Sequence, residues 1–159
     1  MTIAVTGATG FVGQALLERA EQEGLAVKAL TRRNHVARDG IEWVQGDLEA
    51  KAALRQLVRG SEAVIHVAGV VNAPDAAGFE AGNVTGTLNV IEACLAEGVQ
   101  RFIHVSSLSA REPDLSVYGA SKARAEKLVA ASGLDWTMVR PPAIYGPRDT
   151  EMFEMFRIA

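Results

Sequence analysis

Short runs rich in valine and isoleucine alternate along this chain with segments whose apolar residues recur at helical spacing. Several of the strand-like runs are continuously hydrophobic, which is typical of parallel sheets that are buried on both faces. Right-handed crossovers between such strands give an α/β fold with a doubly wound, mostly parallel sheet in three layers, αβα. The expected strands cover residues 2–7, 25–32, 41–47, 61–69, 101–107 and 134–140, and the expected helices cover 11–24, 49–60, 79–98 and 117–133.

The composition suits one compact domain. Of the 159 residues, 48% are hydrophobic and 22% are charged, which is enough apolar surface for a real core. The net charge is -3 and the basic residues are scattered, so a nucleic-acid partner is not expected. No apolar run is long enough to cross a membrane, and no signal peptide is visible at the start of the chain. We therefore expect a cytoplasmic protein.

Neither the cysteine nor the histidines predict a metal or redox centre. Cys94 is the single cysteine and lies on the apolar side of an expected helix, where a buried structural thiol is the simpler interpretation. His35, His66 and His104 are dispersed along the sequence without acidic or cysteine partners at metal-ligand spacing. No metal site is expected.

The stretch "VTGATGFVG", from Val5 to Gly13, joins the first strand to the first helix and predicts an anion site. Its glycines permit a tight turn, a close approach of phosphate to the bare backbone, and close packing of helix on strand. The free N–H groups and the dipole at the helix start favour a pyrophosphate. A plain strand-to-helix turn is the alternative. The residues expected at the pyrophosphate are Gly7, Thr9, Gly10, Phe11, Val12 and Gly13.

Arginines at the end of the second strand bear on which dinucleotide would bind. An acidic residue there would bond the ribose hydroxyls of NAD, whereas an arginine accommodates the 2'-phosphate of NADP. This chain has "LTRRN", with Arg32 at the strand end and Arg33 beside it. The sequence therefore predicts NADP, with NAD as the alternative if the two arginines are only solvated surface residues.

An ordered series of motifs resembles the short-chain dehydrogenase/reductase superfamily in its extended, epimerase/dehydratase-like branch. The resemblance runs from Thr2 to about Pro147 and implies a Rossmann domain over 1–148. Residues 149–159 would begin a carboxyl-terminal substrate region whose remainder is missing from this chain. The motifs are "TGATGFVG", "GDL" at 46–48, "HVAG" at 66–69, "NVTGTLNVIEAC" at 83–94, "VSSLS" at 105–109, "YGASK" at 118–122 and "RPPAIYGP" at 140–147.

The resemblance implies a catalytic set made of Ser107, Tyr118 and Lys122. Tyr118 and Lys122 stand four residues apart on an expected helix and so project from one face. An ammonium beside a phenol favours the phenolate, which lets the tyrosine act as general acid or base. In the family the lysine also holds the nicotinamide ribose, and a serine bonds the reacting oxygen. Ser107 is preferred for that serine over its neighbour Ser106.

The resemblance also implies further cofactor contacts. Asp47 and Leu48 should border the adenine, and the segment that follows the fourth strand should line the cofactor. Asn83 matches the family's helix asparagine, with a structural role at least as reasonable as direct contact. The remaining expected contacts are Val67, Ala68, Gly69, Pro141 and Ile144.

Three functions are compatible with these residues. The first is an NADP-dependent oxidoreductase for a small hydroxyl or carbonyl substrate. The second is a dinucleotide-binding subunit or redox sensor without turnover, and the third is a nucleotide-sugar epimerase or dehydratase. The third is weakened because Ala143 stands where nucleotide-sugar members carry an asparagine.

Two features of the sequence predict contacts outside this chain. Helices around residues 83–98 and 117–132 pair between subunits in many relatives, which makes a homodimer an open expectation. An amphipathic tail of Met152, Phe153, Met155, Phe156 and Ile158 would dock on the missing region, on a partner or on a second copy.

Overall fold

The computed structural model describes residues 1–149, 157 and 158, and its strands form one parallel sheet. The strand order is β3-β2-β1-β4-β5-β6, so the winding reverses between β1 and β4. This is the predicted doubly wound Rossmann sheet. The strands are β1 (Thr2–Thr6), β2 (Ala26–Thr31), β3 (Ile41–Gln45), β4 (Ala63–His66), β5 (Arg101–Val105) and β6 (Asp135–Val139).

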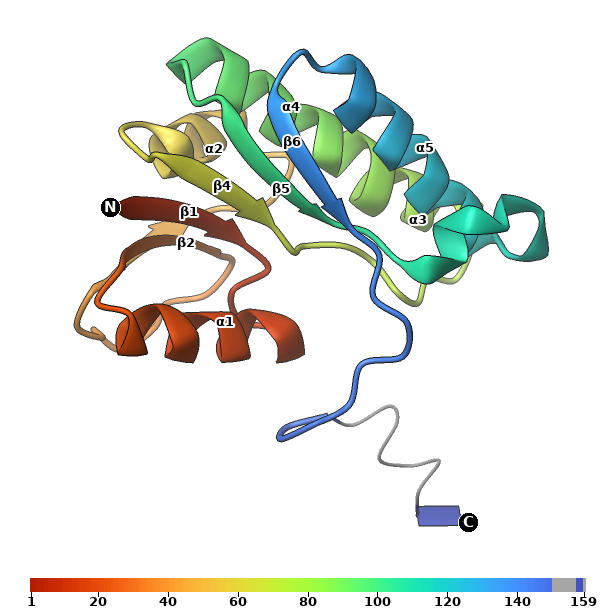
Figure 1. Cartoon of the computed structure of the whole chain (residues 1–159), viewed down its shortest axis with the longest axis horizontal. Coiled ribbons are helices and arrows are strands. Elements are labelled where there is room, and N and C mark those ends of the chain that lie inside the picture. Colours follow the sequence, from red (N-terminus) through yellow and green to blue (C-terminus); the bar gives the residue numbers. More distant parts are fainter. Residues whose placement is uncertain (150–156, 159) are drawn as a thin grey trace.

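The helices divide unequally between the two faces of the sheet. Figure 1 shows α1 on one face, beneath β1 and β2, whereas α2, α4 and α5 lie on the other. The long helices are α1 (Phe11–Gln22), α2 (Lys51–Val58), α4 (Gly86–Glu97) and α5 (Val117–Ala131). The short ones are α3 (Ala76–Phe79), the π-helix η1 (Glu80–Thr85) and the 3-10 helices η2 (Leu108–Arg111) and η3 (Pro113–Leu115).

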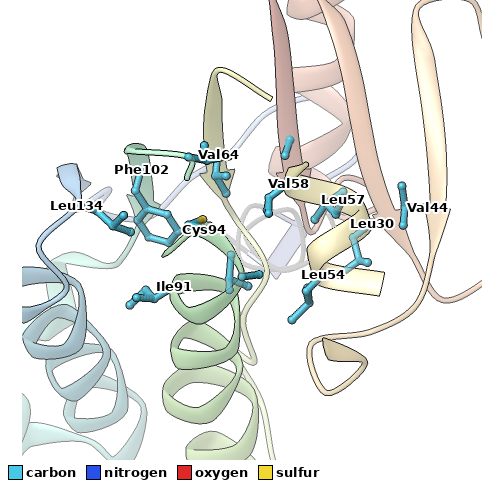
Figure 2. Packing of buried hydrophobic residues seen from close by; sticks show 14 of the residues in the cluster. Leu30, Val44, Leu54, Leu57, Val58, Val64, Ile91, Cys94, Phe102 and Leu134 are labelled. Atoms are coloured by element: carbon cyan, nitrogen blue, oxygen red, sulfur yellow. The ribbon is translucent and has the colours of Figure 1, made fainter. Parts of the chain in front are cut away.

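The larger hydrophobic cluster fills the layer between the sheet and α2, α4 and α5 (Figure 2). Phe102 from β5 and Leu54 and Leu57 from α2 are fully buried in it. Each such side chain contributes about 1.5–3 kcal/mol relative to an exposed one. Cys94 also lies there, and burial raises the pKa of its thiol to about 12. This environment fits the expected structural thiol.

On the α1 face, the described residues cover β5 and β6 less fully than β1 and β2. The smaller cluster there joins α1 to β1 and β2, through Val5, Leu17 and Val27 among others. Val139 of β6 keeps 44% of its surface exposed, and α1 packs against β1 and β2. Hydrophobic strand sequences indicate burial but do not show which segment supplies the cover.

The expected helix at 79–98 is interrupted by a π-helical turn. Helix formation starts earlier, at Ala76, where Asp75 Oδ1 accepts the Gly78 N–H at 2.9 Å. The π turn over residues 80–85 widens the helix and directs Asn83 into the interior, where it is 1% exposed. Helical periodicity alone predicts the helix but not this irregularity.

Two further expectations concern the end of the chain and membranes. Most of the expected second region at 149–159 lies outside the described residues, as do Met152, Phe153, Met155 and Phe156 of the expected amphipathic tail. Across the described part of the chain, no helix is both long enough and apolar enough to cross a membrane.

Candidate functional site

A cleft of about 680 Å³ lies at the carboxyl ends of β1, β4 and β5, beside the point where the winding reverses. Ligands of doubly wound sheets bind at such a point. Segments far apart in the sequence meet there: the glycine loop, the end of β4, the start of α5 and the chain after β6. The predicted residues that line it are Gly7, Thr9, Gly10, Phe11, Val12, Gly13, Val67, Ala68, Gly69, Ser107, Tyr118, Lys122, Pro141 and Ile144.

Glycine occupies each of the three loop positions for a different structural reason. Gly7 has φ +71°, and a Cβ there would lie 2.6 Å from the Ala68 nitrogen. A Cβ at Gly13 would lie 2.1 Å from the Gly7 carbonyl oxygen, so α1 packs too closely for any side chain. At Gly10, by contrast, the nearest atom would be 3.4 Å away. The protein itself has room for a side chain at Gly10, which leaves that space for a ligand.

The first turn of α1 is open to an anion. Its cap, Gly10, offers no side chain, and the turn contains no acidic residue. The first helical hydrogen bond runs from Gln14 N to Gly10 O at 2.9 Å, so the preceding amides have no carbonyl of the helix to bond. In α5, the Ser116 Oγ accepts the Gly119 N–H at 2.9 Å and fills the corresponding place. The start of α1 therefore fits a phosphate group in charge and in space.

Ser107 and Tyr118 reach the cleft from the starts of two helices, η2 and α5. Ser107 caps η2, its Oγ accepting the Ser109 N–H at 3.2 Å, so its hydroxyl hydrogen can still be donated. Tyr118 lies in the first turn of α5, with its ring 6.2 Å from that of Phe79 between centroids. Ser106, the alternative to Ser107, also lines the cleft but is only 5% exposed.

Lys122 lies one turn beyond Tyr118 and is only 4% exposed. Its Nζ donates to the Val105 carbonyl at 2.9 Å. Burial lowers the pKa of this ammonium to about 8, although the nearby Glu126 carboxylate opposes the shift. The folded protein therefore carries a cation at the cleft in a place where a charge is costly to keep.

Replacing Lys122 by methionine should stabilise the protein without cofactor. Between pH 8 and 10.5 the unfolded chain holds the lysine proton and the folded chain does not, so the parent's free energy of unfolding rises with pH there. Below pH 8 the full penalty applies, roughly 3 kcal/mol from the shift less about 1 kcal/mol for the lost hydrogen bond. We expect Lys122→Met to be about 2 kcal/mol more stable at pH 7.

Thermal unfolding between pH 7 and 10 measures this effect, and the gain should shrink above pH 8. Lys127→Met is the matched control, because Lys127 is exposed on the same helix. An unchanged or lower melting temperature for Lys122→Met at pH 7 would contradict the prediction.

The chain after β6 covers part of the cleft. Arg140, at its start, forms two hydrogen bonds with the buried carboxylate of Glu126, at 2.9 and 2.6 Å. Arg148 forms two more with Glu18 of α1, at 2.7 and 2.9 Å. Figure 1 shows this segment passing from the end of β6 toward the level of α1. Ala143 lies in it and lines the cleft.

Four predicted cofactor residues lie outside the cleft, just after the ends of the neighbouring strands β2 and β3. Arg32 and Arg33 follow β2, and both are exposed. Asp47 follows β3, and its Oδ1 accepts the Glu49 and Ala50 amides at 2.9 and 3.0 Å. Leu48 packs against the larger hydrophobic cluster. Because β1, β2 and β3 are adjacent and parallel, these residues share the edge of the sheet with the glycine loop.

Several residues of the cleft were not predicted as contacts. Val70 and Val71 belong to the loop after β4, whose shape depends on Asn83: its Oδ1 accepts the Val70 N–H at 2.7 Å and its Nδ2 donates to the Val70 carbonyl at 2.9 Å. This is the structural role considered for Asn83. The other cleft residues without a prediction are Val105, Pro142 and Asp149. Val105 and Pro142 lie within motifs quoted above, whereas no motif contains Asp149.

Two of the three dispersed histidines lie side by side. The rings of His66 and His104, on β4 and β5, are 5.4 Å apart between centroids, and both are fully buried. Burial holds the pKa of both well below the ordinary value, that of His104 at about 3. In the described part of the chain, no three His, Cys, Asp or Glu side chains gather as they would around a metal ion.

The fold and the cleft together define a dinucleotide-binding α/β domain. Residues 7–155 match the NAD(P)H-binding family, and the chain belongs to that family. The resemblance to extended short-chain dehydrogenases/reductases is confirmed. A short-chain dehydrogenase/reductase superfamily protein from Agrobacterium tumefaciens with bound NAD is 29% identical, has a TM-score of 0.78, and is matched over 88% of this chain and 48% of that one.

Curated relatives include reductases. The chain is 47% identical to the ceramide reductase of Caulobacter vibrioides, over 99% of this chain and 50% of that protein. It is 33% identical to the 2-alkyl-3-oxoalkanoate reductase of Stenotrophomonas maltophilia, over 96% of this chain and 53% of that protein. The chain thus spans about half the length of these relatives.

Proposed function

We propose that this chain is the cofactor and catalytic half of an NADP-dependent reductase for a ketone. The observation that carries the proposal is the meeting of Ser107, Tyr118 and Lys122 in one cleft with an uncapped, glycine-lined helix start. Bound NADPH would supply the hydride for the carbonyl carbon. Tyr118 would donate the proton to the carbonyl oxygen, Ser107 would donate a hydrogen bond to that oxygen, and Lys122 would hold the ribose.

The dinucleotide would extend along the edge of the sheet. The pyrophosphate would bond the amides at the start of α1, and the nicotinamide half would lie in the cleft against Val67, Ala68, Gly69, Pro141 and Ile144. The adenosine half would leave the cleft over β1 and reach Arg32, Arg33, Asp47 and Leu48. Their place outside the cleft is consistent with this, because a dinucleotide is longer than the nicotinamide half that the cleft would enclose.

The lack of ion-pair partners at Arg32 and Arg33 among the described residues supports NADP over NAD. Within the described part of the chain, most basic side chains have a carboxylate or carbonyl partner, as Arg38 has in Glu21 at 2.7 Å. Arg32 and Arg33 have none there, and they stand side by side at the end of β2. Two adjacent uncompensated cations at this edge favour a ligand with a further phosphate.

Arg32→Ala should therefore remove most of the preference for NADPH over NADH. A charge-assisted contact to the 2'-phosphate corresponds to about a ten- to hundredfold difference in affinity. Calorimetric titration of both cofactors measures it, with Lys127→Ala as the control for loss of an exposed cation. Equal affinities of the parent for NADPH and NADH would disprove the role of Arg32.

A groove next to Ser107, lined by leucines and prolines together with Glu112 and three serines, supports a substrate with an aliphatic part. The groove, of about 470 Å³, shares Ser107 and the Pro141–Ala143 segment with the main cleft. Leu108 and Leu115 line it and are 42% and 82% exposed. The names of two relatives, a ceramide reductase and an alkyl-oxoalkanoate reductase, agree with such a substrate. Ala143, in place of the asparagine of nucleotide-sugar members, argues against a sugar nucleotide.

A panel of carbonyl substrates with NADPH tests the proposal, run on this chain and on any longer form of it. The panel should pair short ketones with homologues of increasing chain length. Oxidation of NADPH that rises with chain length supports the proposed reductase. NADPH binding without reduction of any substrate by either form would favour the alternative, a dinucleotide-binding subunit or redox sensor.

Subunit pairing and the division at residue 148 stay predictions. Leu88 and Leu95 are 38% and 50% exposed and stand seven residues apart on α4, which supports a second copy packing on this helix. The proposed partners are thus a small-molecule substrate and a second copy of the chain.

A further inference from the structure

His66 ends β4 beneath the cleft, and both of its ring nitrogens have partners. Its Nδ1 lies 2.6 Å from the Thr6 Oγ1, and its Nε2 lies 3.0 Å from the Thr87 Oγ1. All three side chains are at most 1% exposed. The neighbouring His104 is equally buried, yet neither of its ring nitrogens has a hydrogen-bond partner among the described residues. Burial alone therefore does not account for the hydrogen bonds of His66, which depend on its position between Thr6 and Thr87.

The partners determine the tautomer of His66. The Thr87 hydroxyl donates its hydrogen to the Asn83 carbonyl at 2.6 Å, so its oxygen must accept from His66, and Nε2 carries the proton. Nδ1 then accepts the hydrogen of Thr6, whose oxygen in turn accepts the Ala68 N–H at 3.2 Å. Every donor in this chain of bonds meets an acceptor. In the other tautomer, the Nδ1 hydrogen would point at the Thr6 hydroxyl, whose own hydrogen would then lose its acceptor. Nε2 would be bare and could accept a hydrogen from Thr87 only if Thr87 gave up its bond to the Asn83 carbonyl.

The ring also stays neutral. Burial lowers the pKa of His66 well below its ordinary value, and the nearby His104 and Lys122 act in the same direction. A neutral ring with one donor and one acceptor matches the two hydroxyls that flank it.

Both ends of this hydrogen-bonded chain reach the wall of the cleft. At one end, Ala68 lines the cleft and packs directly on Gly7, the first residue of the glycine loop. At the other, Asn83 belongs to the π turn and bonds the Ser121 hydroxyl at 2.9 Å. Ser121 donates to the Tyr118 carbonyl at 2.7 Å. The chain of bonds thus links the proposed phosphate loop to the helix of the proposed acid.

We propose that His66, as the neutral Nε2–H tautomer, is a positioning residue that holds the glycine loop and the Asn83 turn in the arrangement that receives the dinucleotide. The proposal rests on the proposed function. It predicts that loss of one hydroxyl partner weakens cofactor binding by a protein that is still folded, because the two walls of the cleft are then no longer fixed relative to each other.

The test compares Thr87→Val with Thr87→Ser. Thr87→Val keeps the shape but removes the hydroxyl, so we expect NADPH affinity to fall about tenfold, the effect of about one hydrogen bond. Thr87→Ser should restore affinity to within about twofold of the parent. Thr137→Val is the matched control, because the Thr137 hydroxyl bonds Arg101 at 2.9 Å away from the cleft. A folded Thr87→Val protein with parental NADPH affinity, or no rescue by serine, would overturn the proposal.

A second measurement stays informative even if Thr87→Val fails to fold. In the ¹⁵N–¹H spectrum of histidine-labelled parent protein, the His66 ring should show a protonated Nε2 and a bare Nδ1, unchanged from pH 8 to pH 5. A protonated Nδ1 or a cationic ring in that interval overturns the proposal. This reading needs no cofactor, so failure of the parent to bind NADPH would instead reject the proposed function.

Discussion

Tyr118→Phe should reduce turnover by about 10²- to 10⁴-fold in any form of the protein that reduces a substrate, because it removes the proposed general acid. NADPH affinity should stay near that of the parent. The substitution keeps the ring and its contact with Phe79, and the bond from Ser121 goes to the backbone carbonyl, which the variant retains. Single-turnover oxidation of NADPH and calorimetric titration give the two numbers separately.

The control and the contrary outcome separate the two functional hypotheses. Tyr145→Phe removes another phenolic oxygen, on a side chain that is 71% exposed, and should leave turnover unchanged. If Tyr118→Phe turned over like the parent, Tyr118 would not be the acid. If no form ever reduced a substrate and NADPH still bound, the Ser107, Tyr118 and Lys122 set would be a remnant in a binding subunit.

Gly10→Val should abolish cofactor binding and leave the fold almost unchanged. The backbone at Gly10 has φ -81° and ψ 177°, an extended conformation that valine adopts readily. No protein atom would lie closer than 3.4 Å to the new Cβ, so the branched side chain would fill the space left for the pyrophosphate. Loss of two charge-assisted hydrogen bonds, at about 1.5–3 kcal/mol each, lowers affinity more than a hundredfold.

Calorimetry with NADPH and thermal unfolding test this pair of expectations together. Ala52→Val places the same side chain at an exposed site on α2 and should bind NADPH normally. Gly13→Ala supplies the opposite comparison, since its Cβ would lie 2.1 Å from the Gly7 oxygen and should destabilise the protein. Unchanged NADPH affinity in Gly10→Val would mean that the cofactor binds elsewhere.

The sequence by itself determined the class of fold and the local parts of the site. Strand and helix periodicity are properties of a few adjacent residues, so all six strands could be predicted, with ends that differ by one or two residues at most positions. The glycine loop and the Tyr118–Lys122 pair are local for the same reason: each depends on spacing within a single turn or helix. The ordered motifs then indicated the protein family, and the family match confirmed it.

Only the tertiary structure decided what depends on strand register and on packing between distant segments. Thr6 meets His66 because β1 and β4 pair in parallel with these two residues in register, 60 positions apart. The π turn that directs Asn83 inward and the different demands on Gly7 and Gly10 likewise arise from contacts that no local pattern contains. Burial sets the charge cost at Lys122, and burial belongs to the folded chain as a whole.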